Sequence, residues 1–218
     1  MECKGFLFDL DGTLVDSLPT VERAWANWAK AHRIAPKEVL DFIHGKQAIT
    51  SLRHFLQGQS EETIQQEFDA LEKIEASDTQ GVVEMLGAKV LLARLDELDI
   101  PWAIVTSGTV PIASARHRAA GLPAPRAFIT AEQVARGKPY PDAYLLGARQ
   151  LGLQPAECVV IEDAPAGILS GLAAGCQVIA VKSPSDTPKL DQVALVLDSL
   201  EQILIEKSEH TAIIIHNQ

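Results

Sequence analysis

The chain has 218 residues, of which 47% are hydrophobic and 22% charged, a composition typical of a folded globular protein and not of a disordered or fibrous one. Its 29 acidic and 19 basic residues give a net charge of −10, which repels nucleic acid and anionic membranes where no basic run intervenes. We therefore expect one core, or one core with a small inserted module, and neither nucleic acid nor a membrane as a partner.

The start of the chain and the cysteines indicate the compartment. Only a short apolar run precedes Asp9, without the hydrophobic region of a signal peptide, and no stretch has the ~18 apolar residues of a membrane helix. Cys3, Cys158 and Cys176 do not have the spacing of a metal site or a disulfide framework. We expect a cytoplasmic protein with reduced thiols.

Short apolar runs alternate with helical patterns along the chain. The four clearest runs are residues 5–8, 102–106, 158–161 and 178–181. Continuous apolar runs of this length are typical of strands buried on both faces of a parallel sheet. Two weaker strands, at 128–130 and 194–197, are expected nearer the sheet edges. The sequence therefore predicts an α/β fold.

Helices are expected between these strands, at 110–120, 142–151 and 166–174. Each begins near a proline, and the last two end at a glycine, as helix boundaries commonly do. The tail has two apolar runs, 203–205 and 212–215, separated by polar residues, which predicts a terminal hairpin.

The interval 17–81 contains helical periodicities and no convincing strand. We interpret it as a helical module inserted after the first strand, so that residues 1–16 and 82–218 form the core. Trp25 and Trp28, spaced i and i+3 in this module, are expected to pack in its interior, because helical spacing alone gives that result.

The strongest functional signal is the segment that carries Asp9 and Asp11, which directly follows the first apolar strand. Alternate residues of a strand share a face, so both carboxylates can address one point at the carboxyl end of the sheet. Gly12 then permits a sharp departure of the backbone. Clustered carboxylates repel one another unless a cation lies between them, and a divalent cation would make one a good nucleophile toward phosphorus. An exposed turn is the alternative explanation of this motif alone.

Three further groups of polar residues follow predicted strands or lie in the loops after them. They are Thr106, Ser107 and Gly108 after the second strand, Lys138 in a proline-bounded loop, and Glu162 and Asp163 after the strand at 158–161. Each has an ordinary explanation when taken alone, as a turn, a surface lysine or a helix cap. Their order along the chain is poorly explained by coincidence.

Together these motifs resemble those of the haloacid dehalogenase superfamily, over nearly the whole chain. The resemblance implies a Rossmann-like parallel sheet, a small α-helical cap at 17–81 as in the β-phosphoglucomutase-like branch, and Mg²⁺ as cofactor. It implies that Asp9 is the nucleophile, Asp11 the proton shuttle and Lys138 the cation beside the phosphoryl group. The metal would be held by Asp9, the main-chain carbonyl of Asp11 and Asp163, with Glu162 as a direct or water-mediated ligand.

The resemblance also implies where the substrate lies. A hydroxyl and a backbone N–H in the segment from Thr106 to Gly108 would hold a phosphoryl oxygen, and of the two alternating hydroxyls we favour Ser107. In the cap, His44 and Lys46 lie at a predicted helix break and are candidates for contacting sugar hydroxyls, although a plain helix terminus explains them equally well.

Two positions indicate the branch of the superfamily: Asp11 leaves the phosphatases and phosphomutases, and the first cap helix argues against a mutase. Dehalogenases and phosphonate-cleaving members lack an acid at the position of Asp11, and cation pumps carry threonine there. Mutases of the branch have a histidine early in the first cap helix, where this chain has Val21 and its neighbours.

The chain resembles bacterial sugar phosphatases and the yeast phosphatases that act on 2-deoxyglucose 6-phosphate and glycerol phosphate. We expect a magnesium-dependent phosphatase that acts on a small sugar or polyol phosphate, such as a hexose 6-phosphate, through a phospho-aspartate. A β-phosphoglucomutase-like mutase is the alternative, followed by a non-catalytic metabolite-binding protein of the same fold.

Overall fold

The computed structural model describes residues 1–208 and 211–216. Its main sheet has six parallel strands in the order β6-β5-β2-β7-β8-β9. They are β2 (Gly5–Phe8), β5 (Trp102–Val105), β6 (Ala127–Ile129), β7 (Cys158–Glu162), β8 (Gln177–Val181) and β9 (Leu195–Leu197). The predicted α/β fold with a parallel sheet is confirmed, and the two weaker strands, β6 and β9, lie at the edges.

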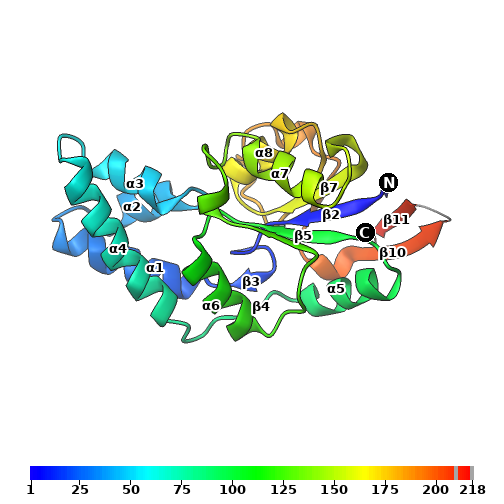
Figure 1. Cartoon of the computed structure of the whole chain (residues 1–218), viewed down its shortest axis with the longest axis horizontal. Helices are drawn as coiled ribbons and strands as arrows, with labels where there is room; N and C mark the ends of the chain where they lie inside the picture. The colour runs from blue at the N-terminus through cyan, green and yellow to red at the C-terminus, as the bar shows by residue number, and fades with distance from the viewer. Residues whose placement is uncertain (209–210, 217–218) are drawn as a thin grey trace.

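Helices cover both faces of this sheet, which explains the unbroken apolar strands (Figure 1). One face packs on α5 (Ala88–Glu97) and α6 (Val110–Ala120), and the other on α7 (Asp142–Gln150) and α8 (Pro165–Ala173). Alternation along β2 divides the core: Phe8 joins the α5 and α6 side, whereas Leu7 joins the α7 and α8 side.

The strand order reverses direction at β2. The chain runs from β2 outward to β5 and β6, and then returns to build β7, β8 and β9 on the other side of β2. Open parallel sheets bind ligands at such a switch point, beyond the carboxyl ends of the strands. The residues that follow β2, β5 and β7 therefore lie where a ligand would bind.

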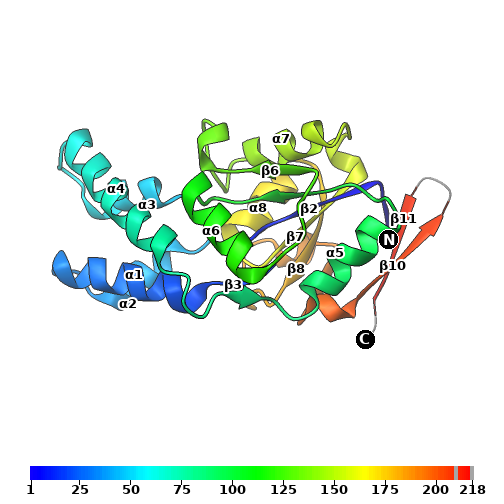
Figure 2. The ribbon, with the colours of Figure 1, turned by 60° about the horizontal axis from the view of Figure 1, so that its bottom comes forward.

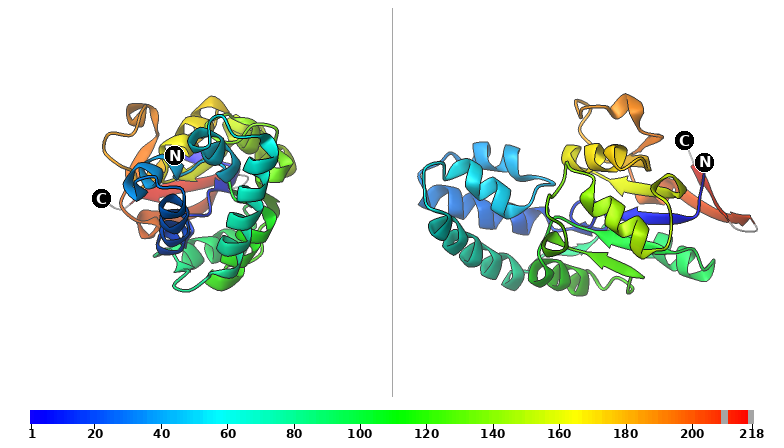
Figure 3. Two further views of the ribbon diagram at one scale, coloured as in Figure 1. Left: turned by 90° about the vertical axis from the view of Figure 1, so that its left-hand side faces the viewer. Right: turned by 45° about the horizontal axis from the view of Figure 1, so that its top comes forward.

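Four helices lie beyond the carboxyl end of the sheet, and we call them the helical module (Figures 1 and 3). They are α1 (Leu18–Ala31), α2 (Pro36–Ile43), α3 (Ala48–Phe55) and α4 (Glu61–Ser77). They share a hydrophobic cluster of their own that includes Trp25, Trp28 and Leu52. The short antiparallel strands β3 (Val15–Asp16) and β4 (Val83–Glu84) join the module to the sheet.

A second, antiparallel sheet brings the two ends of the chain together. Strands β10 (Ile203–Ser208) and β11 (Thr211–His216) form the predicted terminal hairpin, and β1 (Glu2–Cys3), which was not predicted, pairs with β11. Figure 2 shows this sheet beside α5. Short 3₁₀ turns at Ala131–Gln133, Pro155–Glu157, Leu190–Gln192 and Leu200–Gln202 complete the described elements. None of the helices in the described ranges is both long and apolar enough to cross a membrane.

Candidate active site

Four of the predicted site residues meet at the carboxyl end of β2 and β7. Asp9 follows β2, Glu162 ends β7, and the parallel pairing of Phe8 with Ile161 sets these two acids side by side. Carboxylate oxygens of Asp9, Glu162 and Asp163 all lie within 4.8 Å of one another.

Lys138 reaches this cluster from the loop before α7. Its Nζ donates to Asp9 Oδ1 at 2.5 Å, to Glu162 Oε1 at 2.7 Å and to the carbonyl of Val105 at 3.0 Å, which uses all three of its N–H donors. Burial disfavours the charged amine, but the carboxylates of Asp9 and Glu162 outweigh it and raise the pKa of Lys138. The structure thus holds a fixed positive charge against Asp9.

Glu162 is fully buried, and both of its oxygens already accept hydrogen bonds. Oε1 accepts from Lys138 and from the Tyr144 hydroxyl at 2.9 Å, and Oε2 accepts from the backbone N–H groups of Asp163 and Ala164 at 3.0 Å each. These contacts occupy the acceptor positions of the carboxylate. Glu162 therefore holds Lys138 and the loop after β7 in place, and offers little to a metal directly.

Asp163 lies against Gly12, where no other residue fits. Gly12 has a φ of 95°, and a Cβ there would come 2.2 Å from Asp163 Oδ2. The Thr13 hydroxyl donates to Asp163 Oδ1 at 3.0 Å. The backbone around Gly12 thus brings the Asp163 carboxylate in against the segment that carries Asp9.

Burial and repulsion between neighbouring carboxylates disfavour the charged forms of Asp9 and Asp163. Burial, reinforced by Glu162, raises the pKa of Asp163 to about 7. Burial also raises the pKa of Asp9 well above its usual range, although Lys138 opposes the shift. A divalent cation would relieve this repulsion, and carboxylate and carbonyl oxygens are the ligands that Mg²⁺ takes in proteins. The residues present therefore fit a magnesium ion.

Asp163→Asn is expected to stabilise the metal-free protein. Because the folded-state pKa of Asp163 is raised, the carboxyl contributes most stability when protonated, and this contribution is lost as the pH rises toward and through about 7. At pH 8 a neutral amide removes the cost of burying the ionised Asp163 carboxylate. The Tm in EDTA should therefore rise by several degrees, at roughly 2–4 °C for each kcal/mol of stability gained. Thermal unfolding in EDTA measures this.

The same variant tests whether Asp163 binds the metal ion. Mg²⁺ should raise the Tm of the wild type and leave that of Asp163→Asn nearly unchanged, whereas Asp191→Asn, at an exposed position, should behave as the wild type. Equal stabilisation of all three proteins by Mg²⁺ would place the ion elsewhere.

Asp11 stands beside this cluster and has partners of its own. Its Oδ1 accepts from the Ser17 hydroxyl at 2.6 Å and from Arg116 Nη1 at 3.0 Å. Arg116 Nη2 also donates to Glu75 of the helical module, at 2.5 Å. The sequence pattern had identified Asp11 but neither Arg116 nor Glu75.

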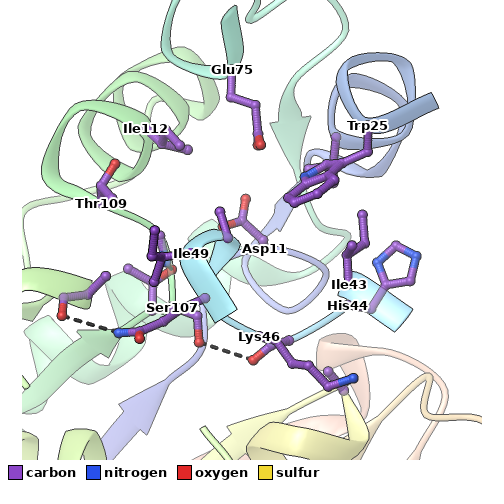
Figure 4. Close-up of a pocket in the computed structure, with 18 of the residues that line it drawn as sticks. Asp11, Trp25, Ile43, His44, Lys46, Ile49, Glu75, Ser107, Thr109 and Ile112 are labelled. Atoms are coloured by element: carbon purple, nitrogen blue, oxygen red, sulfur yellow. Dashed lines mark hydrogen bonds between the residues drawn. The ribbon is translucent and has the colours of Figure 1, made fainter. Parts of the chain in front are cut away.

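A cavity of about 300 Å³ lies between the helical module and the sheet and is lined by both Asp9 and Asp11. Figure 4 shows Asp11 among the residues that line it. Its apolar lining includes Leu18, Val21, Trp25, Ile43, Ile49, Phe68 and Ile112. Its polar lining includes Gln65, Glu75, Arg116 and Glu132. The volume suits a small molecule. Trp25, which was expected only to pack in the module, also lines the cavity.

The two hydroxyls after β5 have different partners. The Ser107 hydroxyl donates to the carbonyl of Gly45 in the helical module at 3.0 Å, and Thr106 Oγ1 accepts from the N–H of Gly108 at 2.9 Å. Both residues line the cavity. Within the described chain, Ser107 thus already uses its proton, while Thr106 has no acceptor for its own.

The loop between α2 and α3 contains His44, Gly45 and Lys46, at the predicted helix break. His44 and Lys46 line the cavity, and burial lowers the pKa of each. The Lys46 amine, however, donates to the carbonyl of Phe42 at 2.6 Å and is directed away from Asp11 (Figure 4). Gly45 has a φ of 74°, and a Cβ there would come 2.7 Å from Ala164 Cβ. Glycine thus lets this loop approach the loop after β7.

Comparison with known proteins identifies the family of the chain. Residues 3–175 match the haloacid dehalogenase-like hydrolase family. The chain is 67% identical over 215 residues to hexitol phosphatase A of Escherichia coli (strain K12), a match that covers 99% of this chain and 100% of that protein.

Two further proteins extend the comparison. Glycerol-1-phosphate phosphohydrolase 2 of Saccharomyces cerevisiae is 33% identical over 189 residues, and this match covers 83% of this chain and 75% of the yeast protein. The crystal structure of a hydrolase from Pseudomonas syringae is similar with a TM-score of 0.81 and 26% identity, covering 91% of this chain and 94% of that one. The chain is therefore an enzyme that belongs to the haloacid dehalogenase-like hydrolase family.

Proposed function

We propose that this enzyme is a magnesium-dependent phosphatase that hydrolyses the phosphate monoester of a small sugar or polyol, with a hexitol phosphate as the first candidate. The observation that carries the proposal is the carboxylate of Asp9, held by Lys138 next to Asp163 at the edge of a cavity of about 300 Å³. The names of the similar enzymes, which act on hexitol and glycerol phosphates, support the substrate class.

In the proposed mechanism, the Asp9 carboxylate attacks phosphorus, and an O–P bond forms as the bond to the leaving oxygen breaks. Asp11 gives a proton to the departing alkoxide. Asp11 then takes a proton from the water that cleaves the phospho-aspartate, which releases phosphate and restores Asp9. Lys138 fixes the attacking carboxylate and balances the charge around it.

Asp9, the main-chain carbonyl of Asp11, and Asp163 would hold the magnesium ion, which when bound stabilises negative charge on the phosphoryl oxygens. Glu162 acts through Lys138, because its own oxygens are already taken. Thr106 and Ser107 are both candidates for holding a phosphoryl oxygen, and Ser107 must release Gly45 in order to do so.

We further propose that residues 17–81 act as a cap domain over a core formed by 1–16 and 82–218. Two contacts support a seated cap: Ser107 donates to Gly45, and Gln47 Nε2 donates to the carbonyl of Ala131 at 3.2 Å. A cap in this position excludes water from the phosphoryl group and surrounds the leaving group.

The charges of the cavity favour a substrate with one phosphate. Of the cations that line it, Arg116 is held by two carboxylates and Lys46 donates to a backbone carbonyl. Glu75 and Glu132 add negative charge to the lining of the cavity. A second phosphate finds no free lysine or arginine among the described lining residues, which supports a phosphatase over a mutase that needs a bisphosphate.

Hydrolysis of a panel of phosphate esters tests the proposal. Sorbitol 6-phosphate, mannitol 1-phosphate, glycerol phosphate and glucose 6-phosphate should each be assayed for phosphate release with Mg²⁺ and with EDTA. We expect a hexitol phosphate to be among the best substrates. EDTA should lower the activity at least about 100-fold, because the negative charge of the transition state is then uncompensated.

β-Glucose 1-phosphate with a trace of its bisphosphate distinguishes the mutase. Steady phosphate release without isomerisation agrees with a phosphatase. Stoichiometric conversion to glucose 6-phosphate without phosphate release would establish the mutase instead, and failure to cleave any ester with Mg²⁺ would favour a binding protein.

A further inference from the structure

The side chain of Arg116 is buried between two acids that belong to different parts of the molecule. It is 3% exposed, and its guanidinium donates to Asp11 on the sheet side and to Glu75 on α4 of the helical module. Glu75 is itself only 4% exposed. A buried guanidinium is tolerated when it is paired in this way, and its planar fork fixes the direction of each partner.

The contact settles which oxygen of Asp11 is available. Oδ1 accepts from both Ser17, at 2.6 Å, and Arg116, at 3.0 Å. Oδ2 lies toward Gly108, since a Cβ built on that glycine would be 3.9 Å from it. Gly108 belongs to the segment after β5 that is expected to bind the phosphoryl group, so Oδ2 faces the place where a leaving oxygen would be.

Glu75 holds the other half of the guanidinium. Its Oε2 accepts from Arg116 Nη2 at 2.5 Å, and Figure 4 shows its side chain directed from α4 toward Asp11. Because Arg116 lies on α6 and Glu75 on α4, the guanidinium is held from both sides only while the helical module is seated on the sheet.

We propose that Arg116 is a positioning residue for Asp11, which fixes Oδ1 so that Oδ2 delivers the proton to the leaving oxygen, and that Glu75 holds Arg116 in place when the module is seated. The inference rests on the proposed function. In the first step the O–H bond of Asp11 Oδ2 breaks as the leaving oxygen takes its proton, while the P–O bond to that oxygen breaks and the bond to Asp9 forms.

Leaving-group dependence tests this role. Phenyl phosphate and 4-nitrophenyl phosphate are similar in shape and lack sugar hydroxyls, but phenolate needs a proton in order to leave far more than nitrophenolate does. The ratio kcat/KM covers only the steps up to phenol release. In Arg116→Gln we expect kcat/KM to fall at least about 10-fold more for phenyl phosphate than for 4-nitrophenyl phosphate.

Three other variants complete the comparison. Asp11→Asn should give the same selective loss, larger in size, and Glu75→Gln a smaller one. Arg118→Gln, at an exposed position two residues along the same helix, should match the wild type on both esters. Equal losses on both aryl phosphates in Arg116→Gln would mean a purely structural ion pair and overturn the proposal. Equal losses of kcat/KM on the two aryl phosphates, together with a larger loss on a hexitol phosphate, would mean that Arg116 contacts the sugar part of the substrate. That result would also overturn the proposal.

A structural measurement keeps the inference testable if no ester is cleaved, a result that would contradict the proposed function itself. Crystal structures of the wild type and Arg116→Gln should differ at Asp11, whose carboxylate should leave its present orientation in the variant. An unchanged carboxylate, with Oδ2 still toward Gly108, would show that Arg116 does not position it.

Discussion

Asp9→Asn is expected to lower kcat for phosphate release on the order of 10⁴-fold or more, as loss of a nucleophile does in other covalent mechanisms. The amide oxygen can still accept the hydrogen bond from Lys138 that Asp9 Oδ1 accepts now, so the fold should persist. An amide cannot form the phospho-enzyme. Steady-state assays with Mg²⁺, together with a thermal melt of each protein, measure both halves of the prediction.

The control is Asp186→Asn, which makes the same chemical change at an exposed position and should keep wild-type activity. Undiminished turnover by Asp9→Asn, purified in the absence of the wild type, would remove Asp9 from the nucleophile's role. If Asp9→Asn were inactive and also unfolded, the loss of activity would be due to lost stability, and the expected persistence of the fold would be contradicted.

Lys138→Met is expected to destabilise the fold by about 3–5 kcal/mol, the usual consequence of breaking a buried ion pair. Methionine fills a similar volume but leaves Asp9 and Glu162 facing each other without the ammonium that now contacts both at 2.5 and 2.7 Å. Urea unfolding at pH 8 measures the loss, and activity should be abolished in parallel.

The pH dependence of this variant gives a second readout. Burial already raises the pKa of Asp9 against the opposing charge of Lys138, and without that cation the folded-state pKa of Asp9 lies further above the unfolded value. Stability should therefore recover as the pH falls from 8 toward 5.5 and a proton neutralises Asp9. Lys189→Met, at an exposed lysine, should show neither effect. A loss below about 1 kcal/mol at pH 8 would mean that the buried contacts of Lys138 contribute little.

Much of the fold was predictable because its signals are local. A strand buried on both faces is apolar at every residue, so β2, β5, β7 and β8 could be recognised singly. Helix α5 was not identified, although Leu91, Leu92 and Leu95 form an evident buried stripe. Strand β1 has only two residues and exists through its pairing with β11, a contact between the ends of the chain that no local pattern reveals.

The site divides in the same way. Asp9 and Asp163 each follow a strand at the sheet's carboxyl edge, so topology alone brings them together. Glu75 and Arg116 are separated by 41 residues and occupy two different helices. The one available signal was a charged residue on the apolar face of α6, next to Ile112 and Ala113 in the buried set. Such a residue requires a buried partner, but the sequence does not say which.

Chemical trapping of the phospho-enzyme tests the nucleophile most directly. The protein is mixed with Mg²⁺ and a hexitol phosphate, quenched during turnover, and treated with borohydride, which reduces an acyl phosphate to the alcohol. Mass spectrometry of the segment between Lys4 and Arg23, which contains Asp9, Asp11 and Asp16, should then find homoserine at position 9 and aspartate at the other two. Homoserine at another position, or steady Mg²⁺-dependent phosphate release with Asp9 never modified, would contradict a phospho-aspartate formed on Asp9.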